Sequence, residues 1–372
     1  MANTLTPIAP TLYSAAKEVA AEPTAIVGAI NMNFDDKGVA KGDTVDVPVA
    51  PAQTETDFTP SNVTSTGDNG TASAISVAIT HSKKVSRFLT GEEIRSLENA
   101  GNNAEWAGQW AKQAMRTLRN GAEGVAYDAL RIGASRAYGT AGTTPFASDL
   151  TALTNARKIL KDNGAPLADL QFVCDTNAEL NLTNLGIIQQ AYQAGSDGER
   201  RSGNVGRQFG FQIGSSAGID SITKGTGASY QLNGAHAIGA TTIAVDTGSG
   251  TILAGDVVTI GNHKYVAKTA LSGGSFTISD PGLREAFADN QAITVGNNFV
   301  ANLAFERSAF VGVMRPPLIP SNATIRQMMV SDQFGLTYLM LEIDQYGQRS
   351  WEMHLAYGFK PVNNEFAALV LG

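Results

Sequence analysis

The chain has 372 residues, of which 43% are hydrophobic and 16% charged, and its formal net charge is -7. This length allows a large core and favours more than one domain, while the acidic balance argues against a protein that holds nucleic acid through a basic surface. A single cysteine, Cys174, excludes an intrachain disulfide and fits a reducing compartment. We find no signal-peptide pattern and no apolar stretch long enough to cross a membrane, so we expect a protein made in the cytosol.

The first 40 residues predict a short helical arm that is interrupted at Pro23. Residues 41–51 and 74–80 alternate between apolar and polar side chains, which predicts two strands. The polar stretch between them, roughly residues 53–70, predicts a long hairpin tip. Such a hairpin is too thin to bury a core of its own, so it either lies on a partner or forms the edge of a sheet.

Thr90 and Glu93 have the spacing of a capping box, which predicts a short helix. A proline-free run from Asn103 to Tyr138 then predicts one long helix, because apolar or small side chains recur along it at steps of three and four. Gly133 or Gly139 can end it. Gly121 and Gly124 lie within this run, where each lowers helix stability unless another backbone passes close by. The apolar stripe comprises Trp106, Trp110, Ala114, Leu118, Ala122, Val125, Ala129 and Ile132. Off the stripe lie Lys112, Arg116, Arg119 and Glu123.

Residues 150–213 alternate between helical and strand patterns, which predicts a compact α/β lobe. The first helix ends at Gly164, the next strand contains Cys174 as an inert core residue, and a second helix begins near Thr176.

From about residue 223 to 297, short strands parted by turns predict a small β-barrel inserted into the larger fold. Its strand candidates are Ile243–Val245, Val257–Ile260, Lys264–Lys268, Ser275–Ile278 and Ala292–Val295. Residues 301–314 predict helical or mixed structure. The chain then ends in a hairpin around residues 344–347 and a last strand.

The most enzyme-like motif is IAVDTGSG, at residues 243–250. Aspartic proteases carry an apolar pair followed by Asp-Thr-Gly, and two such aspartates share a proton. This chain has one copy, within a run of hairpins where the same letters are a natural turn sequence. The four histidines lack metal-ligand spacing, and we find no nucleophile elbow, P-loop or dinucleotide motif. We therefore expect no catalytic, cofactor-binding or metal-binding residues, with a hydrolase centred on Asp246 as the alternative from a different class.

The segments GDTVDVPV (42–49), AGDVVTIGNHKY (254–265) and LAYGFKPVNNEFAALVLG (355–372), together with the long helix, resemble parts of one known family. In this order they resemble the major capsid (coat) proteins of tailed bacteriophages, most of all the podovirus type that carries an inserted β-barrel. The resemblance covers nearly the whole chain as architecture, although the N-terminal region is short and the insert compact. It implies an α+β phage capsid shell fold of the Hong Kong phage type, with a long spine helix, an extended β-hairpin loop, an α/β axial domain and an inserted small all-β domain.

The resemblance also implies a division into domains. These are an N-terminal arm (1–40), an extended β-hairpin loop with its re-entry segment (41–98), the spine helix of a peripheral domain (99–139), an axial α/β domain (140–222), the inserted β-barrel (223–297), and the remainder of the axial and peripheral domains with the C-terminal hairpin (298–372). The candidate subunit-interface residues are Asp57, Phe58, Asp68, Trp106, Trp110, Arg200 and Arg201.

Under this resemblance the protein self-assembles, as pentamers and hexamers, into an icosahedral shell around double-stranded DNA. Scaffolding and portal proteins are the implied partners, with no cofactor and no membrane, and the protein is made in the host bacterial cytoplasm and ends in the virion. Two alternatives share the structural class: an encapsulin-type cage that stores enzymes, which the inserted β unit disfavours, and a phage tail or decoration subunit, which the long helix disfavours.

Overall fold

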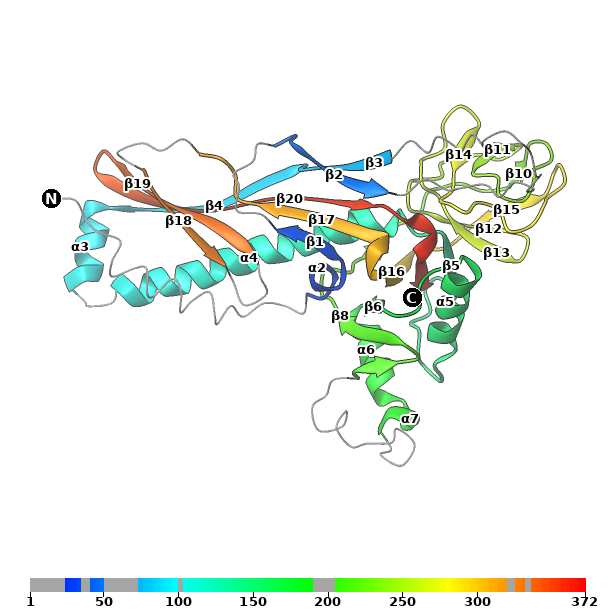
Figure 1. Ribbon diagram of the computed structural model, residues 1–372, viewed down its shortest axis with the longest axis horizontal. Coiled ribbons are helices and arrows are strands. Elements are labelled where there is room, and N and C mark those ends of the chain that lie inside the picture. The colour runs from blue at the N-terminus through cyan, green and yellow to red at the C-terminus, as the bar shows by residue number, and fades with distance from the viewer. Residues whose placement is uncertain are drawn as a thin grey trace, which may run out of the picture.

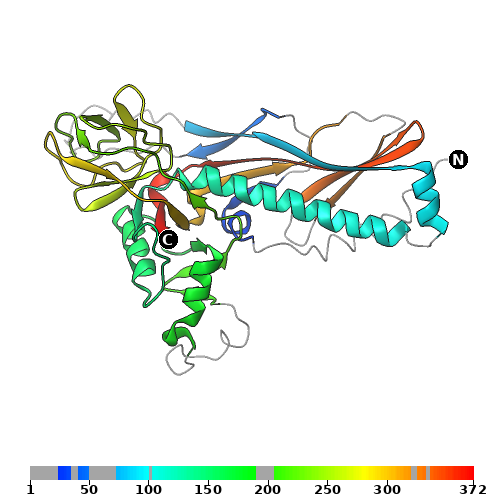
Figure 2. The same ribbon diagram turned by 180° about the vertical axis from the view of Figure 1, so that it is seen from behind.

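The computed structural model describes residues 24–34, 41–49, 73–99, 103–189, 205–319, 325–331 and 336–372. An elongated arm runs along the long axis of the molecule, and two rounder units, a β-barrel and an α/β lobe, lie at one end of it (Figure 1). Seen from behind, the longest helix lies along one face of the arm's sheet (Figure 2).

The helices are α2 (Ile26–Ala29), α3 (Gly91–Asn99), α4 (Asn103–Arg131), α5 (Thr151–Asp162), α6 (Thr176–Asn184) and α7 (Gly186–Gln189), with 3₁₀ turns η1 (Arg307–Ala309) and η2 (Asn364–Phe366). The arm contains β1 (Asn31–Phe34), β4 (His81–Thr90), β17 (Phe310–Arg315), β18 (Ile325–Ser331), β19 (Thr337–Gln345) and β20 (Gln348–Pro361), beside a hairpin of β2 (Thr44–Val49) and β3 (Ser73–Ala78). The lobe contains β5 (Arg136–Tyr138), β6 (Leu170–Cys174), β7 (Arg207–Gln208), β8 (Phe211–Ser215), β9 (Ser221–Ile222), β16 (Phe299–Glu306) and β21 (Ala367–Leu371). The barrel contains β10 (Tyr230–Leu232), β11 (Thr242–Asp246), β12 (Val257–Ile260), β13 (His263–Val266), β14 (Ser275–Thr277) and β15 (Ala292–Val295).

The 14-residue strand β20 organises the sheet of the arm. Along one edge it pairs with β4 over residues 348–357, and along the other it pairs first with β19 and then with β17. β18 lies next to β19, and β1 runs parallel to β17. Strands from three distant parts of the sequence, β1, β4 and the run β17–β20, thus form one six-stranded sheet.

Helix α4 has 29 residues and is therefore ~44 Å long at ~1.5 Å per residue. Its buried side chains include Ala114, Met115, Leu118 and Ala122, which belong to one apolar cluster with Met353 and other residues of β19 and β20. The predicted helix is present and ends at Arg131, close to Gly133, the earlier of the two predicted ends. Beyond it the backbone turns to form β5, whose pairing with β21 and β13 overrides the local helical pattern.

Two charged residues of α4 that the sequence placed off the apolar stripe are buried: Arg119 is 6% exposed and Glu123 is 1% exposed. At Gly121 and Gly124, two of the three glycines of this helix, no backbone lies where a Cβ atom would be placed. A Cβ atom at Gly121 would meet only the Tyr357 hydroxyl, at 3.9 Å, and one at Gly124 would meet nothing within 4 Å.

The Glu123 carboxylate joins three segments of the chain. It accepts hydrogen bonds from the backbone N–H groups of Ala25, Ile26 and Val27, at 2.7, 2.8 and 3.1 Å, where α2 begins. It also accepts a 2.7 Å hydrogen bond from the hydroxyl of Ser216, just beyond β8 in the lobe. Because a buried charge is tolerated only when its hydrogen bonds are satisfied, these four donors explain how a carboxylate lies inside the core.

The lobe and the barrel share one continuous sheet of 13 strands, in the order β14-β11-β10-β15-β12-β13-β5-β21-β16-β6-β8-β7 with β9 beside β16. The connection between them is the antiparallel pairing of β13 with β5. The barrel closes on itself because a bridge between Ala267 and Ile278 joins the ends of β13 and β14. Its interior has its own apolar cluster, which includes Tyr265, Phe276 and Ile293.

Local signals explain several elements and fail for two. The Thr90–Glu93 capping box is confirmed: the backbone N–H of Thr90 donates to the Glu93 carboxylate at 2.9 Å, and α3 follows. The strands proposed for the barrel and the C-terminal hairpin are also present. The helical alternative for residues 301–314 is wrong, because this segment forms most of β16 and β17 inside two sheets. Strand β4 was not predicted, since residues 81–90 show no clean alternation.

We predict that Glu123→Ala lowers the free energy of unfolding by roughly 3 kcal/mol, because it leaves buried N–H groups without an acceptor. Urea unfolding of the purified subunit measures this change. Glu105→Ala is the matched control on the same helix, since Glu105 is exposed and accepts from Gln109 on the helix surface, and it should cost less than ~0.5 kcal/mol. Equal stability of the two variants would contradict the structural role of Glu123.

Candidate subunit interface

The structure describes only two of the interface residues proposed from the sequence. Asp57, Phe58, Asp68, Arg200 and Arg201 lie outside the described residues.

Trp106 and Trp110 are on α4, and both are partly buried against the main apolar cluster of the arm. Trp106 meets Trp351 of β20 edge-on, with ring centroids 5.5 Å apart. Much of their surface is therefore used within the subunit, and their role in an interface stays a prediction.

The described part of the β2–β3 hairpin is anchored on the arm through its base. Val77 and Ile79 are fully buried against Val311 and Val313 of β17, and Ala356 of β20 completes this cluster. The exposed side chains of the hairpin, among them Thr44, Asp46 and Ser76, are mostly polar. Among the described strands, β2 and β3 pair only with each other.

A glycine allows this base to lie so close to β20. A Cβ atom at Gly358 would fall 2.0 Å from the carbonyl oxygen of Ala78 and 3.1 Å from the Cα atom of Ile79. These neighbours are backbone atoms, which cannot move aside as a flexible side chain can. Gly358 is therefore required for the docking of the hairpin base.

Several large apolar side chains that the sequence analysis did not single out are exposed, among them residues of the arm and of the lobe. On the arm, Phe88 of β4 is 60% exposed and Met329 of β18 is 46% exposed. Phe88 lies opposite Ser350 in the β4–β20 register, whereas the next residue, Trp351, faces α4. Because successive side chains of a strand point to opposite faces, Phe88 lies on the face turned away from α4.

The second place is the lobe, where Leu180 and Ile187 of α6 and α7 and Phe209 before β8 are 58%, 48% and 45% exposed. Exposed apolar side chains that gather in this way mark candidate contact surfaces. No periodicity in the sequence distinguishes them from core residues, so only the fold identifies them.

Strand β4 is also an open edge, since among the described strands it pairs with β20 alone. An open edge presents unpaired backbone groups to other chains, and charged side chains such as Lys83, Lys84 and Arg87 restrict such pairing. The arm thus exposes Phe88 on an edge strand, β4, whose charged side chains limit backbone pairing with other chains.

Four charged side chains connect β18, β19 and β20 in the arm. The Glu342 carboxylate, only 2% exposed, lies 3.1 Å from the guanidinium of Arg326 and 3.0 Å from that of Arg349. Asp344 pairs with the same two arginines, at 3.2 and 2.7 Å. The network keeps a buried carboxylate fully paired, which holds the three strands in register.

Two histidines lie on the β4–β20 pair. His81 stacks on Tyr357, with ring centroids 5.5 Å apart, and His354 lies 2.9 Å from the Glu352 carboxylate, which also binds Lys84 at 2.8 Å. Burial lowers the pKa of the His81 imidazole, and the charge of Lys83 adds to this. Burial also lowers the pKa of His354, against an opposing effect of Glu352.

The residues that could have indicated an enzyme have structural roles. Asp246 ends β11, and its carboxylate accepts a hydrogen bond from the hydroxyl of the next residue, Thr247, at 2.9 Å. Cys174 is fully buried in β6, and burial raises the pKa of its thiol far above the ordinary value. Within the described ranges, no group of three or more His, Cys, Asp or Glu side chains could hold a metal ion. In the same part of the chain, no helix is long and apolar enough to cross a membrane.

Comparison with known proteins gives matches in structure alone. Neither a protein-family profile nor a curated protein sequence matches the chain. A structure from Mycobacterium phage Che8 is similar with a TM-score of 0.50 and 14% identity, over 95% of this chain and 93% of that one. The capsid of cyanophage P-SCSP1u has a TM-score of 0.49 and 11% identity, over 94% and 88% of the two chains. A virus-like particle from Pyrococcus furiosus has a TM-score of 0.46 and 8% identity, over 98% of each chain.

At these identities the similarity defines the fold. The chain has the α+β shell fold of tailed-phage capsid proteins, of the Hong Kong phage type, as the sequence analysis predicted.

We predict opposite effects for two Gly-to-Ala substitutions. Gly358→Ala should lower the free energy of unfolding by roughly 2 kcal/mol and speed amide exchange in β3, because its new Cβ displaces the hairpin base. Gly124→Ala, the matched control, should raise the stability by about 0.5–1 kcal/mol, since it enters a helix without a clash. Hydrogen exchange and urea unfolding measure both effects, and unchanged exchange in β3 of Gly358→Ala would refute the anchoring role.

We predict that the subunit loses stability as the pH falls below about 6.5. The folded-state pKa values of His81 and His354 are lowered, so the unfolded chain takes up protons first and acidification favours unfolding. This contribution is fully present above the unfolded pKa and is lost as the pH falls towards the folded values. Urea unfolding at a series of pH values should show a shallower dependence in His81→Gln and His354→Gln, and slopes equal to that of the parent would contradict the assignment.

Proposed function

We propose that this chain is the major capsid protein of a tailed bacteriophage. Copies of it self-assemble, as pentamers and hexamers, into an icosahedral shell that encloses double-stranded DNA. The observation that carries the proposal is the shell fold, which is matched over 95% of the chain. The role is structural rather than catalytic, which agrees with the placement of Asp246 at the end of β11 and of Cys174 in the core.

The β2–β3 hairpin supports assembly. A two-stranded ribbon is at best marginally stable alone, and the base of this one is packed on the rest of the subunit. Residues 41–98 are therefore assigned as the extended loop and its re-entry segment, which lie over a neighbouring subunit. The exposed Phe88 and Met329 on the outer face of the arm are suited to receive such a partner, because contact would remove their apolar surface from water.

The other parts follow the same proposal. Residues 1–40 form the N-terminal arm, 99–139 the spine helix of the peripheral domain, 140–222 the axial domain, 223–297 the inserted barrel and 298–372 the remainder. The exposed apolar side chains of the lobe, Leu180 and Ile187, support contacts of the axial domain between subunits.

The proposal also includes the partners and the location. Scaffolding and portal proteins act during assembly, the subunit is made in the host bacterial cytoplasm, and its final place is the virion. A net charge of -7 suits a wall that encloses DNA without binding its sequence, because like charges do not hold the packaged phosphates on the protein.

We predict that deletion of residues 53–70 leaves a folded subunit that no longer forms shells, because the loop proposed to cover the neighbour is removed. Electron microscopy of the full chain and of the deletion variant, with and without a co-expressed scaffolding protein, measures assembly, and circular dichroism verifies the fold. Phe88→Ser is a second variant, which should weaken assembly without unfolding the subunit.

Uniform closed shells from the full chain and none from the deletion variant support the proposal. Normal shells from the deletion variant would overturn the extended-loop assignment alone. A full chain that stays a monomer or dimer with the scaffolding protein would overturn the capsid function. Shells that contain enzymes instead of DNA would favour the encapsulin-type alternative.

A further inference from the structure

The turn between β7 and β8 holds a phenylalanine in a backbone conformation that suits other residues better. The two strands pair as far as Gln208 and Phe211, so Phe209 and Gly210 form a two-residue turn. Their φ angles of 48° and 88° are both positive, which is the pattern of a type I′ turn. Glycine, asparagine and aspartate fit such positions, whereas a bulky side chain there costs free energy. The ring of Phe209 is nevertheless 45% exposed, so only part of it is used within the subunit.

Two arginines flank this turn. The guanidinium of Arg207 donates to the carbonyl oxygens of Gly210 at 3.0 Å and of Ala168 at 2.7 Å, which fixes its orientation. The guanidinium of Arg157, on α5, lies over the same glycine, because a Cβ atom at Gly210 would be 3.8 Å from its Cζ atom. Lys161, one turn further along α5, is the neighbour of Arg157 on the helix surface. We call Arg157, Lys161, Arg207 and Phe209 the α5–β7 surface.

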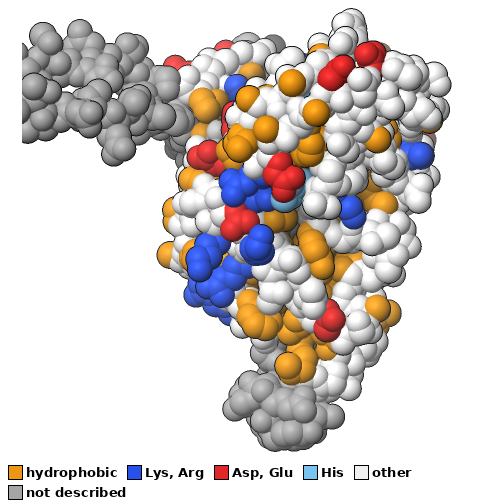
Figure 3. Space-filling view, turned by 90° about the vertical axis from the view of Figure 1, so that its right-hand side faces the viewer, with side chains coloured by type: hydrophobic (Ala, Val, Ile, Leu, Met, Phe, Trp, Pro, Cys, Tyr) orange, Lys and Arg blue, Asp and Glu red, His pale blue; other side chains and the backbone are white. Residues whose placement is uncertain are grey.

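The positive charge of this surface is not neutralised within the described residues, where none of its three cations has a carboxylate within ion-pair distance. Two carboxylates nearby in the sequence bind other cations: Asp162 binds Lys158 and Arg136, and Asp169 binds Arg307. Lys and Arg side chains gather on the lobe below the barrel, with hydrophobic side chains beside them (Figure 3). In a chain with a net charge of -7, such an excess of positive charge is a local exception.

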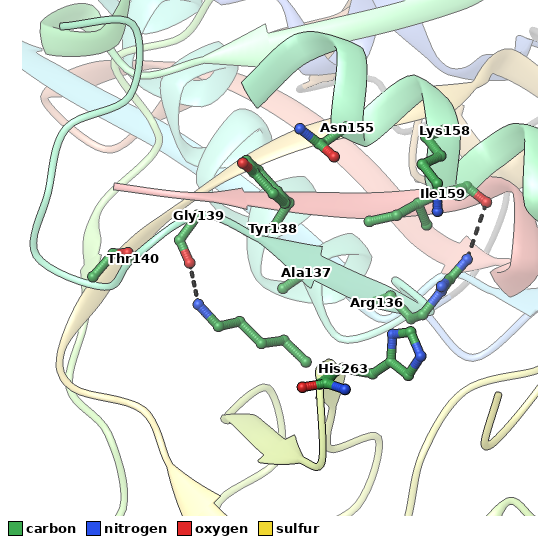
Figure 4. A pocket seen from close by; sticks show the side chains of 11 residues that line it. Arg136, Ala137, Tyr138, Gly139, Thr140, Asn155, Lys158, Ile159 and His263 are labelled. Atoms are coloured by element: carbon green, nitrogen blue, oxygen red, sulfur yellow. Dashed lines mark hydrogen bonds between the residues drawn. The ribbon is translucent and has the colours of Figure 1, made fainter. Parts of the chain in front are cut away.

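Another side of α5 shows the contrast. There Lys158 extends toward β5, at a cavity between the lobe and the barrel that Arg136 and His263 also line (Figure 4). Lys158 lies 3.1 Å from the Asp162 carboxylate, and Arg136 donates to Asn163 at 3.2 Å. The cations at the cavity thus have their partners inside the subunit, whereas those of the α5–β7 surface are available to another molecule.

The residue types of the α5–β7 surface define the partner that fits it. The planar fork of a guanidinium matches a carboxylate or a phosphate, and a phenylalanine ring gains free energy from apolar contact or stacking. A DNA duplex presents phosphates and keeps its bases stacked, so it would leave the ring in water. Single-stranded nucleic acid stacks successive bases on several rings along a groove, and this surface has one ring. A protein segment with acidic and apolar side chains uses every member of the surface, and arginine and phenylalanine are enriched in protein interfaces.

We propose that the α5–β7 surface binds an acidic segment of a partner protein in which carboxylates flank an apolar side chain. Arg157, Lys161 and Arg207 bind the carboxylates, and Phe209 covers the apolar side chain. The strained conformation of Phe209 is then explained by the exposure of its ring to the partner. This contact is additional to the contacts between copies of the chain that build the proposed shell.

The test is fluorescence anisotropy with two labelled peptides, DEDLEDE and DEDSEDE, and the full-length protein in its unassembled form. DEDLEDE should bind about tenfold more tightly than DEDSEDE, because its leucine loses water-exposed surface at the ring. Both affinities should fall as the salt concentration rises, since ion pairs at an exposed surface are screened. A short DNA, as a single strand and as a duplex, is titrated in the same way.

Three variants separate the two kinds of contact. Arg157→Glu reverses one charge and should weaken the binding of both peptides by at least about tenfold. Phe209→Asn should weaken the binding of DEDLEDE alone, because asparagine accepts a positive φ angle but removes the ring. Lys268→Glu makes the same charge change at an exposed residue of the barrel and is the matched control, which should bind as the parent does. Melting curves verify that each variant is folded.

Binding of DEDLEDE that Arg157→Glu and Phe209→Asn weaken and Lys268→Glu leaves unchanged supports the proposal. Equal affinities for the two peptides, or no peptide binding at ~1 mM, would overturn it. Tighter binding of either DNA, with the same dependence on Arg157, would identify a nucleic-acid surface instead. A change in the sedimentation of the protein alone in Arg157→Glu would make a second copy the partner. Shell formation is no part of the readout, so none of these results bears on the capsid function.

Discussion

The hydrogen bonds of the Glu123 carboxylate are the constraint on which the arrangement of the subunit depends. They fix the start of α2 and the end of β8 to the middle of α4, so three segments separated by more than 90 residues meet at one buried charge. A buried carboxylate without its donors is far less stable than one in water, so the arm, the lobe and the N-terminal segment must come together for any of them to be stable there. Apolar packing alone would permit sliding along the helix, whereas four directed hydrogen bonds specify one position.

β20 has the corresponding role in the sheet. Its 14 residues pair with β4 on one edge and with β19 and β17 on the other. A single strand therefore connects the far end of the arm, where Glu342 binds two arginines, to the end near the lobe, where Gly358 lies against the hairpin base. The face toward α4 carries the apolar cluster and, at its far end, the charged network of Glu342, and the other face carries Phe88 and the Lys84–Glu352 pair. The α4 face thus stabilises the subunit, and the other face exposes a large apolar side chain.

The sequence alone predicted the elements whose signals lie within a few neighbouring residues. The period of α4, the capping box at Thr90, the turns of the barrel and the C-terminal hairpin were all predictable, and so was the shell fold. The burial of Arg119 and Glu123 was not, because their partners are about 95 residues away and a helical period describes only one helix. Strand β4 lacks alternation and is formed by its pairing with β20. For residues 301–314, a short apolar run fits a buried strand and a buried helix equally well.

The shared sheet of the lobe and the barrel has a mechanical consequence. The barrel is joined to the lobe by strand pairing as well as by the covalent chain. β13 pairs with β5, and β5 pairs with β21, the last strand of the chain. The barrel and the lobe are therefore connected by backbone hydrogen bonds across the pairs Lys264–Ala137 and Tyr265–Arg136, besides the covalent chain. A movement of the barrel relative to the lobe would have to distort or break this pairing.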